Sequence, residues 1–112
     1  MATLFEKIAA GEIPGDIVYR DDICFVLQDI APQAPTHLLI IPFQPLKSVA
    51  EAREKDAALL GHLLLVVQKM AQKYAEDGNF RTIINSGERA GQSVPHLHIH
   101  LLAGRDFSWP PG

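Results

Sequence analysis

Cysteine is almost missing from this chain, since Cys24 is the only one among 112 residues. A single cysteine cannot form an internal disulfide, and no Cys-x-x-Cys pair exists for a zinc ribbon or a redox site. The neighbouring residues Ile23 and Phe25 are apolar. This context favours a small core side chain at Cys24 over a reactive thiol.

Positive charge and long hydrophobic runs are also scarce. Ten basic against thirteen acidic side chains give a formal net charge of -3, which disfavours non-specific binding to nucleic acid or an anionic membrane. The longest apolar run, Leu59 to Val67, is too short to span a bilayer and contains Gly61 and His62. No basic segment leads into an apolar run at the N-terminus, so no secretory signal is expected. These absences predict a cytoplasmic protein.

The remaining composition is that of one globular domain covering residues 1–112. Hydrophobic residues make up 47% and charged residues 21% of the chain, as in ordinary folded proteins. Turn signals and apolar patterns predict five strands, at residues 17–20, 23–29, 37–42, 80–85 and 94–103. A tight turn at Asp21-Asp22 would join the first two.

Two helical regions are predicted. The first covers residues 3–10, and the second starts near the capping-box pattern at Ser48 and ends near Asp77-Gly78. Its apolar stripe comprises Leu59, Leu60, Leu63, Leu64, Val67, Met70, Ala71 and Tyr74. Short turns between strands, with one long helical excursion, predict an α+β fold in which helices cover one face of an antiparallel sheet.

Three histidines occupy alternate positions in the segment Pro95-His96-Leu97-His98-Ile99-His100-Leu101-Leu102. Side chains alternate across a strand, so the three imidazoles would share one face. A helix would also bring His96 and His100 together, but the strict alternation, Pro95 and β-branched Ile99 favour a strand. One such histidine is most simply a half-buried polar residue. Three crowded imidazoles resist protonation, which favours a binding or catalytic role.

A polar loop with two glycines, residues 87–94, leads into this strand and can point backbone amides at an anion. His98 has an imidazole on each side, and it is the natural nucleophile. With an anion held by Ser93, the loop amides and His100, attack by His98 on phosphorus would give a phosphohistidine intermediate.

The histidine pattern resembles the signature of the histidine-triad family. Three further segments, Asp29–His37, Gly91–Val94 and Trp109–Gly112, are similar to those of its Hint branch, the histidine-triad nucleotide-binding proteins. The resemblance implies a HIT-like fold with one long and one short helix, in which two five-stranded sheets dimerise into ten strands. It implies a purine nucleoside phosphoramidase that converts adenosine 5′-phosphoramidates, such as AMP-lysine or AMP-amine, to AMP without a metal or cofactor.

The resemblance also implies roles for particular residues. His98 would become nucleotidylated, oriented by the backbone carbonyl of His96, while His100 and the Val94 amide would hold the α-phosphate and His37 would complete the cluster. Further substrate contacts would come from Ser93 and Gln92 near the leaving atom, Gly91 and Asn85 at the phosphate, Asp29 and Ile30 at the ribose, Phe5, Ile8 and Leu27 at the base, and Trp109 from the partner's tail.

Simpler roles compete with several of these assignments. Asp29 could start a turn, Asn85 could satisfy local backbone, His37 could be a packed polar residue and Trp109 could cover the core. His62 belongs to no motif of the family, which favours a structural or surface role. Gln28 and Pro95 differ from the pattern of the animal Hint proteins, which leaves the substrate preference open.

Three other functions also fit the sequence. The first is hydrolysis of dinucleoside polyphosphates by the same histidine. The second is a non-catalytic zinc protein that uses His96, His98 and His100 or His37 as ligands, because imidazole suits zinc. The third is a nucleotide-sensing module whose hydrolysis is incidental.

Overall fold

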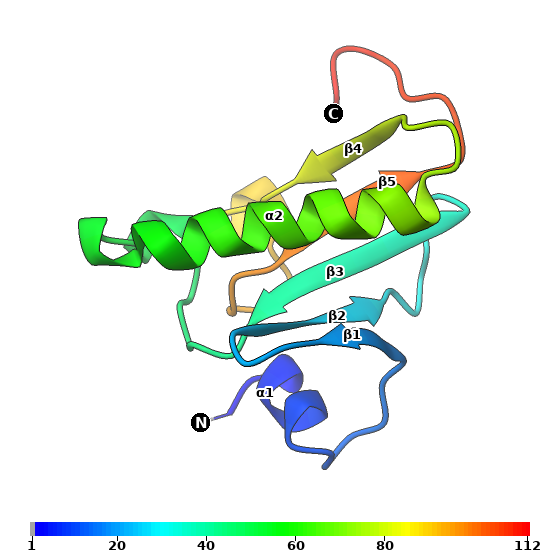
Figure 1. Ribbon diagram of the computed structural model, residues 1–112. Coiled ribbons are helices and arrows are strands. Elements are labelled where there is room, and N and C mark those ends of the chain that lie inside the picture. Colours follow the sequence, from blue (N-terminus) through cyan, green and yellow to red (C-terminus); the bar gives the residue numbers. More distant parts are fainter. Residues whose placement is uncertain (1) are drawn as a thin grey trace.

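The computed structural model describes residues 2–112, which form two helices and a five-stranded sheet (Figure 1). The helices are α1 (Leu4–Ala9) and α2 (Ala57–Tyr74), and the strands are β1 (Ile17–Arg20), β2 (Cys24–Gln28), β3 (Thr36–Pro42), β4 (Phe80–Ile83) and β5 (Ile99–Ala103). All neighbouring strands are antiparallel, in the order β1-β2-β3-β5-β4. The predicted α+β fold is confirmed. None of the helices in residues 2–112 is long and apolar enough to cross a bilayer.

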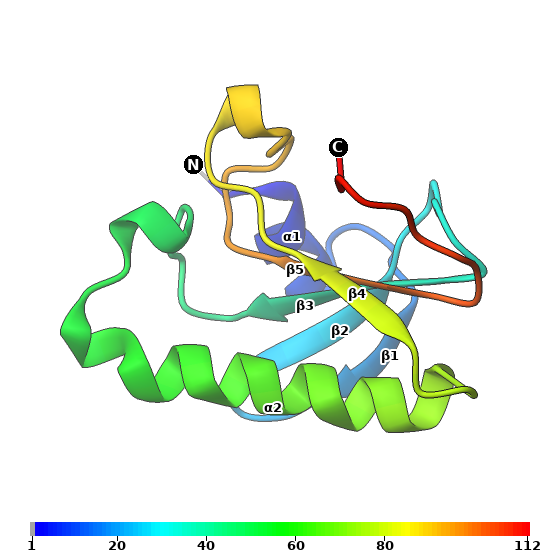
Figure 2. The ribbon, with the colours of Figure 1, turned by 90° about the horizontal axis from the view of Figure 1, so that it is seen from above.

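The two helices lie on opposite faces of the sheet, and Figure 2 shows α2 on one side and α1 on the other. On β3, Leu38 and Ile40 pack in the cluster under α2, while Leu39 and Ile41 pack in the cluster that includes α1. The prediction that helices cover only one face is therefore wrong. Because consecutive residues of this central strand are apolar, both of its faces need a cover.

The helix α2 buries Leu63, Val66, Val67, Met70 and Ala71. The predicted stripe is largely confirmed, but Leu64 is 54% exposed because its position lies beyond the edge of the face that meets the sheet. Ser48 caps a single 3₁₀ turn at Val49–Glu51, after which the backbone of Ala52 is extended. The long helix therefore begins later than the capping signal predicts.

The strand that carries the histidines is shorter than predicted. Its pairing with β3 begins at Ile99, opposite Ile40. Pro42 and Pro95 have no amide hydrogen to extend the ladder, and the His96 Nε2–H instead donates to the Pro42 carbonyl at 2.8 Å. The predicted alternation still holds before the strand, because Leu97 lies in the core under α2. The strand β4 is also shorter than predicted and ends at Ile83.

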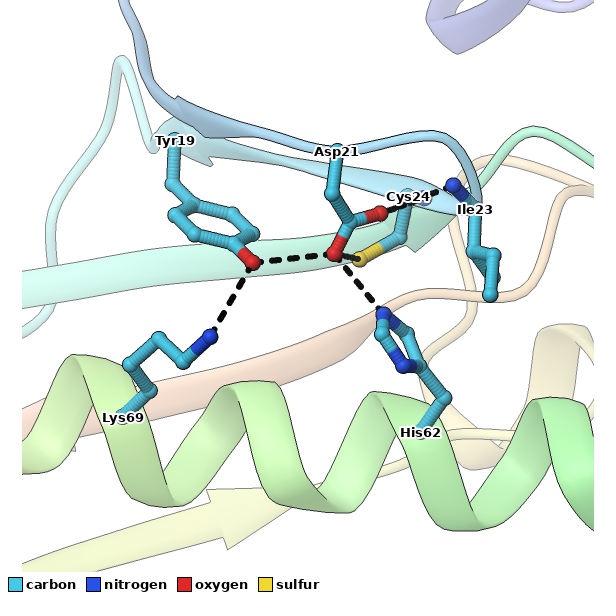
Figure 3. Close-up of polar contacts among 6 residues, drawn as sticks. All are labelled: Tyr19, Asp21, Ile23, Cys24, His62 and Lys69. Atoms are coloured by element: carbon cyan, nitrogen blue, oxygen red, sulfur yellow. Dashed lines mark hydrogen bonds and ion pairs between the residues drawn. The ribbon is translucent and has the colours of Figure 1, made fainter.

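A polar cluster fastens the β1–β2 turn to α2 (Figure 3). Asp21 Oδ2 accepts hydrogen bonds from His62 Nε2 at 2.8 Å and from the Tyr19 hydroxyl at 2.9 Å, while Oδ1 accepts from the amides of Ile23 and Cys24. His62 thus has a structural role, and the Asp21 side chain stabilises the predicted turn. Burial raises the pKa of the Cys24 thiol to about 12, which makes this fully buried residue an inert core side chain.

Candidate active site

Four histidines meet on the face of the sheet that α1 covers. His37 on β3 pairs with Leu102, and Leu39 pairs with His100 on β5. His37 and His100 are therefore diagonal neighbours on one face. The ring centroids are 5.2 Å apart for His37 and His100 and 5.1 Å apart for His98 and His100. The alternating sequence pattern thus produces a continuous cluster of imidazoles.

The tautomer of His98 is fixed by a backbone carbonyl. Its Nδ1 lies 2.7 Å from the His96 carbonyl oxygen, which can only accept, so Nδ1 carries the proton. The other nitrogen, Nε2, keeps a lone pair. The Phe5 ring contacts the imidazole edge-to-face at a centroid distance of 5.0 Å. The His98 ring is thus held in one orientation with an unprotonated Nε2, the state in which an imidazole can act as a nucleophile.

A backbone amide fixes the tautomer of His37, and His37 in turn fixes the tautomer of His100. The Gln33 N–H donates to His37 Nδ1 at 3.0 Å, so the ring proton of His37 must be on Nε2. That proton is donated to His100 Nδ1 at 2.9 Å. The remaining nitrogen of His100, Nε2, therefore carries a proton that it can donate to an anion.

Burial keeps these imidazoles neutral. It lowers the pKa of His98, although the hydrogen bond to the His96 carbonyl opposes the shift. Burial, with the nearby rings of His98 and His37, lowers the pKa of His100 to about 4. Burial also lowers the pKa of His37, against the attraction of the Asp29 carboxylate. A neutral nucleophile beside neutral hydrogen-bond donors is the state that nucleophilic attack requires at pH 7.

His96 has a different position from the other two histidines of the segment. Its ring is buried, with Nε2–H donating to the Pro42 carbonyl. Its Nδ1 is therefore an acceptor, and it lies 3.3 Å from the Thr3 hydroxyl. The ring thus ties β3 to the start of α1, while its carbonyl orients His98. The expected role of the His96 carbonyl matches this geometry.

A cavity of about 280 Å³ opens beside His98 and His100, near the lower end of the range of about 300–1,000 Å³ for ligand sites. Most of its wall is apolar, and a few polar groups converge on it. The expected residues that line it are Phe5, Ile8, Leu27, Asp29, Ile30, Ser93, Val94, His98 and His100. The sequence prediction did not include Leu4, Ile13, Pro14, Gly15, Gln28 and Leu39, which also line it.

Asp29 both shapes a turn and lines the cavity. Its Oδ1 accepts from the Ala31 amide at 2.8 Å and so shapes a turn. Its Oδ2 lies 3.4 Å from His37 Nε2, and the residue lines the cavity. The carboxylate is therefore able to accept hydrogen bonds from a ligand hydroxyl beside the histidines.

The side chain of Gln92 holds together the loop before the histidines. The buried Gln92 amide donates to the carbonyls of Lys47 and Val94 and accepts from the Gly87 amide. Both of its N–H donors are used, so the structure does not offer this side chain to a leaving group as expected. It fixes the loop that presents Ser93 and Val94 to the cavity.

Four of the expected substrate contacts do not line the cavity: Gln92, Asn85, Gly91 and Trp109. Asn85 lies beside Gly91, whose backbone has a φ of +96° that favours glycine, and neither residue lines the cavity. Trp109, in the C-terminal tail, is 83% exposed. Ile30 lines the cavity but is 98% exposed.

Sequence reasoning missed two residues that act on the histidines. Gln33 follows Pro32 in a loop with few amides, and its N–H fixes His37. Thr3 is the N-cap of α1 and contacts His96. A polar residue before the short helix was a visible cap signal. Its proximity to His96 arises only from the folded chain.

One group of possible metal ligands overlaps this site. Ligand atoms of Asp29, His37 and His100 lie within 4.8 Å of one another. This group contains two of the suggested zinc ligands, His37 and His100, together with Asp29, and it does not include His96 or His98. Metal binding at His37 Nε2 would require the ring proton to move to Nδ1, where the Gln33 amide already donates.

The sequence is similar to known proteins over almost its whole length. The HIT domain family matches residues 10–107. An uncharacterized HIT-like protein from Synechococcus elongatus is 54% identical over 98% of this chain and 96% of its own length. A 14 kDa zinc-binding protein from Zea mays is 45% identical over 98% of this chain and 88% of its own length.

Solved structures agree with this relationship. A HIT family hydrolase from Legionella pneumophila superposes with a TM-score of 0.94 and 42% identity, covering 99% of this chain and 100% of that one. A histidine triad nucleotide-binding protein from Candida albicans has a TM-score of 0.82 and 27% identity, covering 99% and 85%. With its cluster of histidines on the sheet and its HIT domain over residues 10–107, the chain belongs to the histidine-triad family and has the fold of its hydrolases.

Proposed function

We propose that the protein is a purine nucleoside phosphoramidase, which hydrolyses the P–N bond of adenosine 5′-phosphoramidates to AMP. The observation that carries the proposal is the fixed tautomer of His98. Its Nδ1–H donates to the His96 carbonyl at 2.7 Å, so the Nε2 lone pair is free to attack phosphorus. A pKa lowered by burial keeps that nitrogen unprotonated at neutral pH.

The cavity wall supports a nucleoside monophosphate as the bound part of the substrate. Its apolar residues, among them Phe5 and Leu27, suit the faces of a purine base. The Asp29 carboxylate accepts from ribose hydroxyls, and His100 Nε2–H donates to a phosphate oxygen. The Ser93 hydroxyl and the Val94 amide complete the phosphate contacts.

The reaction has two steps. In the first, His98 Nε2 forms a bond to phosphorus and the P–N bond to the leaving amine breaks. The amine takes up a proton, relayed from solvent by the Ser93 hydroxyl. In the second step, water attacks phosphorus and loses a proton to solvent, and the bond to Nε2 breaks to release AMP and neutral His98. The neutral donors around the phosphate stabilise charge in both transition states.

The test follows AMP release from an adenosine 5′-phosphoramidate of a simple amine. We expect the wild type to release AMP in the presence of a chelator, and His98→Ala to lose at least about 10³-fold in rate. His62→Gln is the matched control, because His62 lies in the cluster with Asp21 on the other face of the sheet. A folded wild type without release would contradict the proposal, as would an active His98→Ala.

The same protein preparation tests the related functions. Faster turnover of diadenosine triphosphate than of the phosphoramidate would favour dinucleoside polyphosphate hydrolysis. Tight AMP binding without turnover would favour a nucleotide-sensing module. Phosphoramidate hydrolysis and dinucleoside polyphosphate hydrolysis would use the same attack by His98, so the preferred leaving group distinguishes these two functions.

Zinc binding is a second candidate function, favoured by the cluster of Asp29, His37 and His100 and by the name of the maize relative. Against it stands the Gln33 amide, which occupies the nitrogen that would have to become protonated. Titration calorimetry with zinc, combined with the AMP-release assay, distinguishes a zinc-binding protein from a phosphoramidase. Stoichiometric zinc binding that disappears in His37→Ala, in a folded protein that releases no AMP with or without the metal, would replace the phosphoramidase proposal.

The proposed enzyme is a homodimer joined through β4. This strand is at the edge of the sheet, and unpaired edges invite a second strand. Phe80 and Ile84 along this edge are 42% and 41% exposed, and Leu64 and Leu65 of α2 are 54% and 66% exposed. Antiparallel pairing of two β4 strands would extend the sheet to ten strands. The partner subunit's Trp109 would then reach this active site from its tail.

A further inference from the structure

The segment between β2 and β3 sets the protonation pattern of the active site. Pro32 and Pro35 have no amide hydrogens, so few donors remain in this segment. The Ala31 amide donates to Asp29 Oδ1, and the Gln33 amide donates to His37 Nδ1. The position of the Gln33 peptide therefore decides which nitrogen of His37 carries the proton.

A clamp from the C-terminal tail holds the adjoining peptide, the one between Gln33 and Ala34, and so restrains the Gln33 backbone from its other side. The Arg105 Nε–H donates to the Gln33 carbonyl at 2.9 Å. The guanidinium also donates to the Asp106 carbonyl and lies 4.2 Å from the centroid of the Phe107 ring, so its orientation is fixed by three contacts. Residues Ala31 to Gln33 are exposed to solvent, although Ala34 is buried, so hydrogen bonds help to hold this segment in place.

Close packing beside the guanidinium supports the clamp. Gly104, just after β5, has a φ of +98°, and a Cβ atom there would lie 2.9 Å from Pro35 Cβ. The tail thus touches the same segment at two adjacent residues. Only glycine permits this close approach.

We propose that Arg105 is a positioning residue of the active site. It acts through the backbone of Gln33, whose carbonyl it binds and whose N–H donates to His37, on the tautomer of His37. Through His37 it acts on the proton that His100 Nε2 offers to the substrate phosphate. This inference rests on the proposed function for its catalytic consequence. The structural link from Arg105 to His37 can be measured without any substrate.

Arg81 provides a matched control. Its guanidinium lies 5.2 Å from the same Phe107 ring and donates to the Ser108 carbonyl at 2.9 Å. It therefore anchors the tail as Arg105 does, with the same charge, but its hydrogen bond goes to the tail rather than to Gln33. A general effect of loosening the tail would appear in Arg81→Gln as well.

The experiment records imidazole ¹⁵N spectra of the full-length protein at neutral pH. In the wild type we expect His37 Nδ1 to be unprotonated and Nε2 protonated. Arg105→Gln should shift His37 toward a mixture of tautomers, Arg105→Lys should restore part of the wild-type pattern, and Arg81→Gln should leave it unchanged. An unchanged His37 in Arg105→Gln, or an equal change in Arg81→Gln, would overturn the proposal.

The kinetic arm uses the adenosine 5′-phosphoramidate. We expect Arg105→Gln to lower kcat by about three- to tenfold, the effect of one weakened hydrogen bond, with little change in KM. A changed tautomer without a change in kcat would overturn the catalytic part of the inference. If the wild type itself releases no AMP, the proposed function fails, while the spectra still decide whether Arg105 positions His37.

Discussion

At the scale of single residues, the site depends on which nitrogen of each imidazole carries a proton. The His96 carbonyl fixes His98, and the Gln33 amide fixes His37 and through it His100. The contacts that fix His98 and His37 are made by backbone, whose hydrogen-bonding role does not change with pH, and His37 passes its orientation on to His100. The neutral state of the cluster is therefore built into the fold.

The pH dependence of AMP release follows from that neutral state. Protonation of His98 removes the attacking lone pair, and burial lowers its pKa below the ordinary value of 6.5. We expect kcat/KM to stay near its maximum as the pH falls through 6.5 and to decline only at lower pH, because this parameter reports the free enzyme. A decline already centred above pH 7 would contradict an unprotonated, buried nucleophile.

The side chain of Gln92 should matter for stability before it matters for chemistry. Replacing it with Ala leaves the Lys47 carbonyl and the Gly87 amide without their partner. We expect Gln92→Ala to lower the free energy of unfolding by about 1–3 kcal/mol, measured by urea denaturation. Wild-type stability with a large loss of activity would instead return Gln92 to the expected role near the leaving group.

At the scale of elements, α1 is short and depends on its cap. The Thr3 hydroxyl accepts from the Glu6 amide, and the Glu6 carboxylate accepts from the Thr3 amide. The helix carries Phe5 and Ile8 of the cavity wall. Anything that loosens this cap therefore also loosens the proposed base site.

Thr3→Ala tests that coupling. We expect a loss of about 1 kcal/mol in the free energy of unfolding, together with a raised KM, because both the cap and the contact with His96 are removed. Thr3→Ser keeps a hydroxyl and should behave as the wild type. An unchanged KM in Thr3→Ala would show that α1 stays in place without its cap.

The Asp21 cluster sets the stability of the hairpin against α2. Burial alone would raise the pKa of this carboxyl, but hydrogen bonds from the backbone amides of Cys24 and Ile23 and from His62 and Tyr19 hold it well below its usual range. Its stabilising effect is therefore present above the ordinary value of 3.8 and is lost as the pH falls further. We expect Asp21→Asn to lower the free energy of unfolding by about 1–3 kcal/mol at pH 7. Equal stability of Asp21→Asn and the wild type at pH 7 would contradict this role.

At the scale of the whole molecule, exposed apolar side chains gather where α2 passes near β4. Gln68 and Gln72 of α2 line a surface hollow together with Phe80, and Leu64 and Leu65 lie on the same side of the helix at helical spacing. The edge strand and this helix face thus form one surface. It is the surface that the proposed dimer would cover.

Introducing negative charges on that surface should dissociate the proposed dimer into monomers. We expect light scattering to give the mass of a dimer for the wild type and of a monomer for Leu65→Glu combined with Ile84→Glu, because buried, unpaired carboxylates disfavour association. Ile23→Lys is the control, since this 40% exposed residue lies in the β1–β2 turn. A monomeric wild type would overturn the dimer.

Much of the fold was predictable because its signals are local. The central strands, the α1 helix and the body of α2 follow from apolar spacing, and their positions are confirmed. The strand ends were missed at Val94–His98 and Ile84–Asn85, because pairing of β5 with β3 starts at Ile99 and pairing of β4 with β5 ends at Ile83. Before the strand, the Leu97 amide donates to the Leu46 carbonyl, outside the sheet. Leu64 was misplaced because a spacing pattern does not define how wide a contact face will be.

The sequence by itself determined the alternation that puts His98 and His100 on the face opposite Leu97 and Ile99, since a period of two is a local property of extended backbone. It also determined the family, because the histidine pattern is specific. Only the tertiary structure decided the long-range partners of the imidazole nitrogens. The contacts of His37 with His100, of His96 with Thr3 and of Gln33 with Arg105 join residues that are 63, 93 and 72 positions apart, and a hydrogen bond between distant segments depends on positions that no local spacing contains.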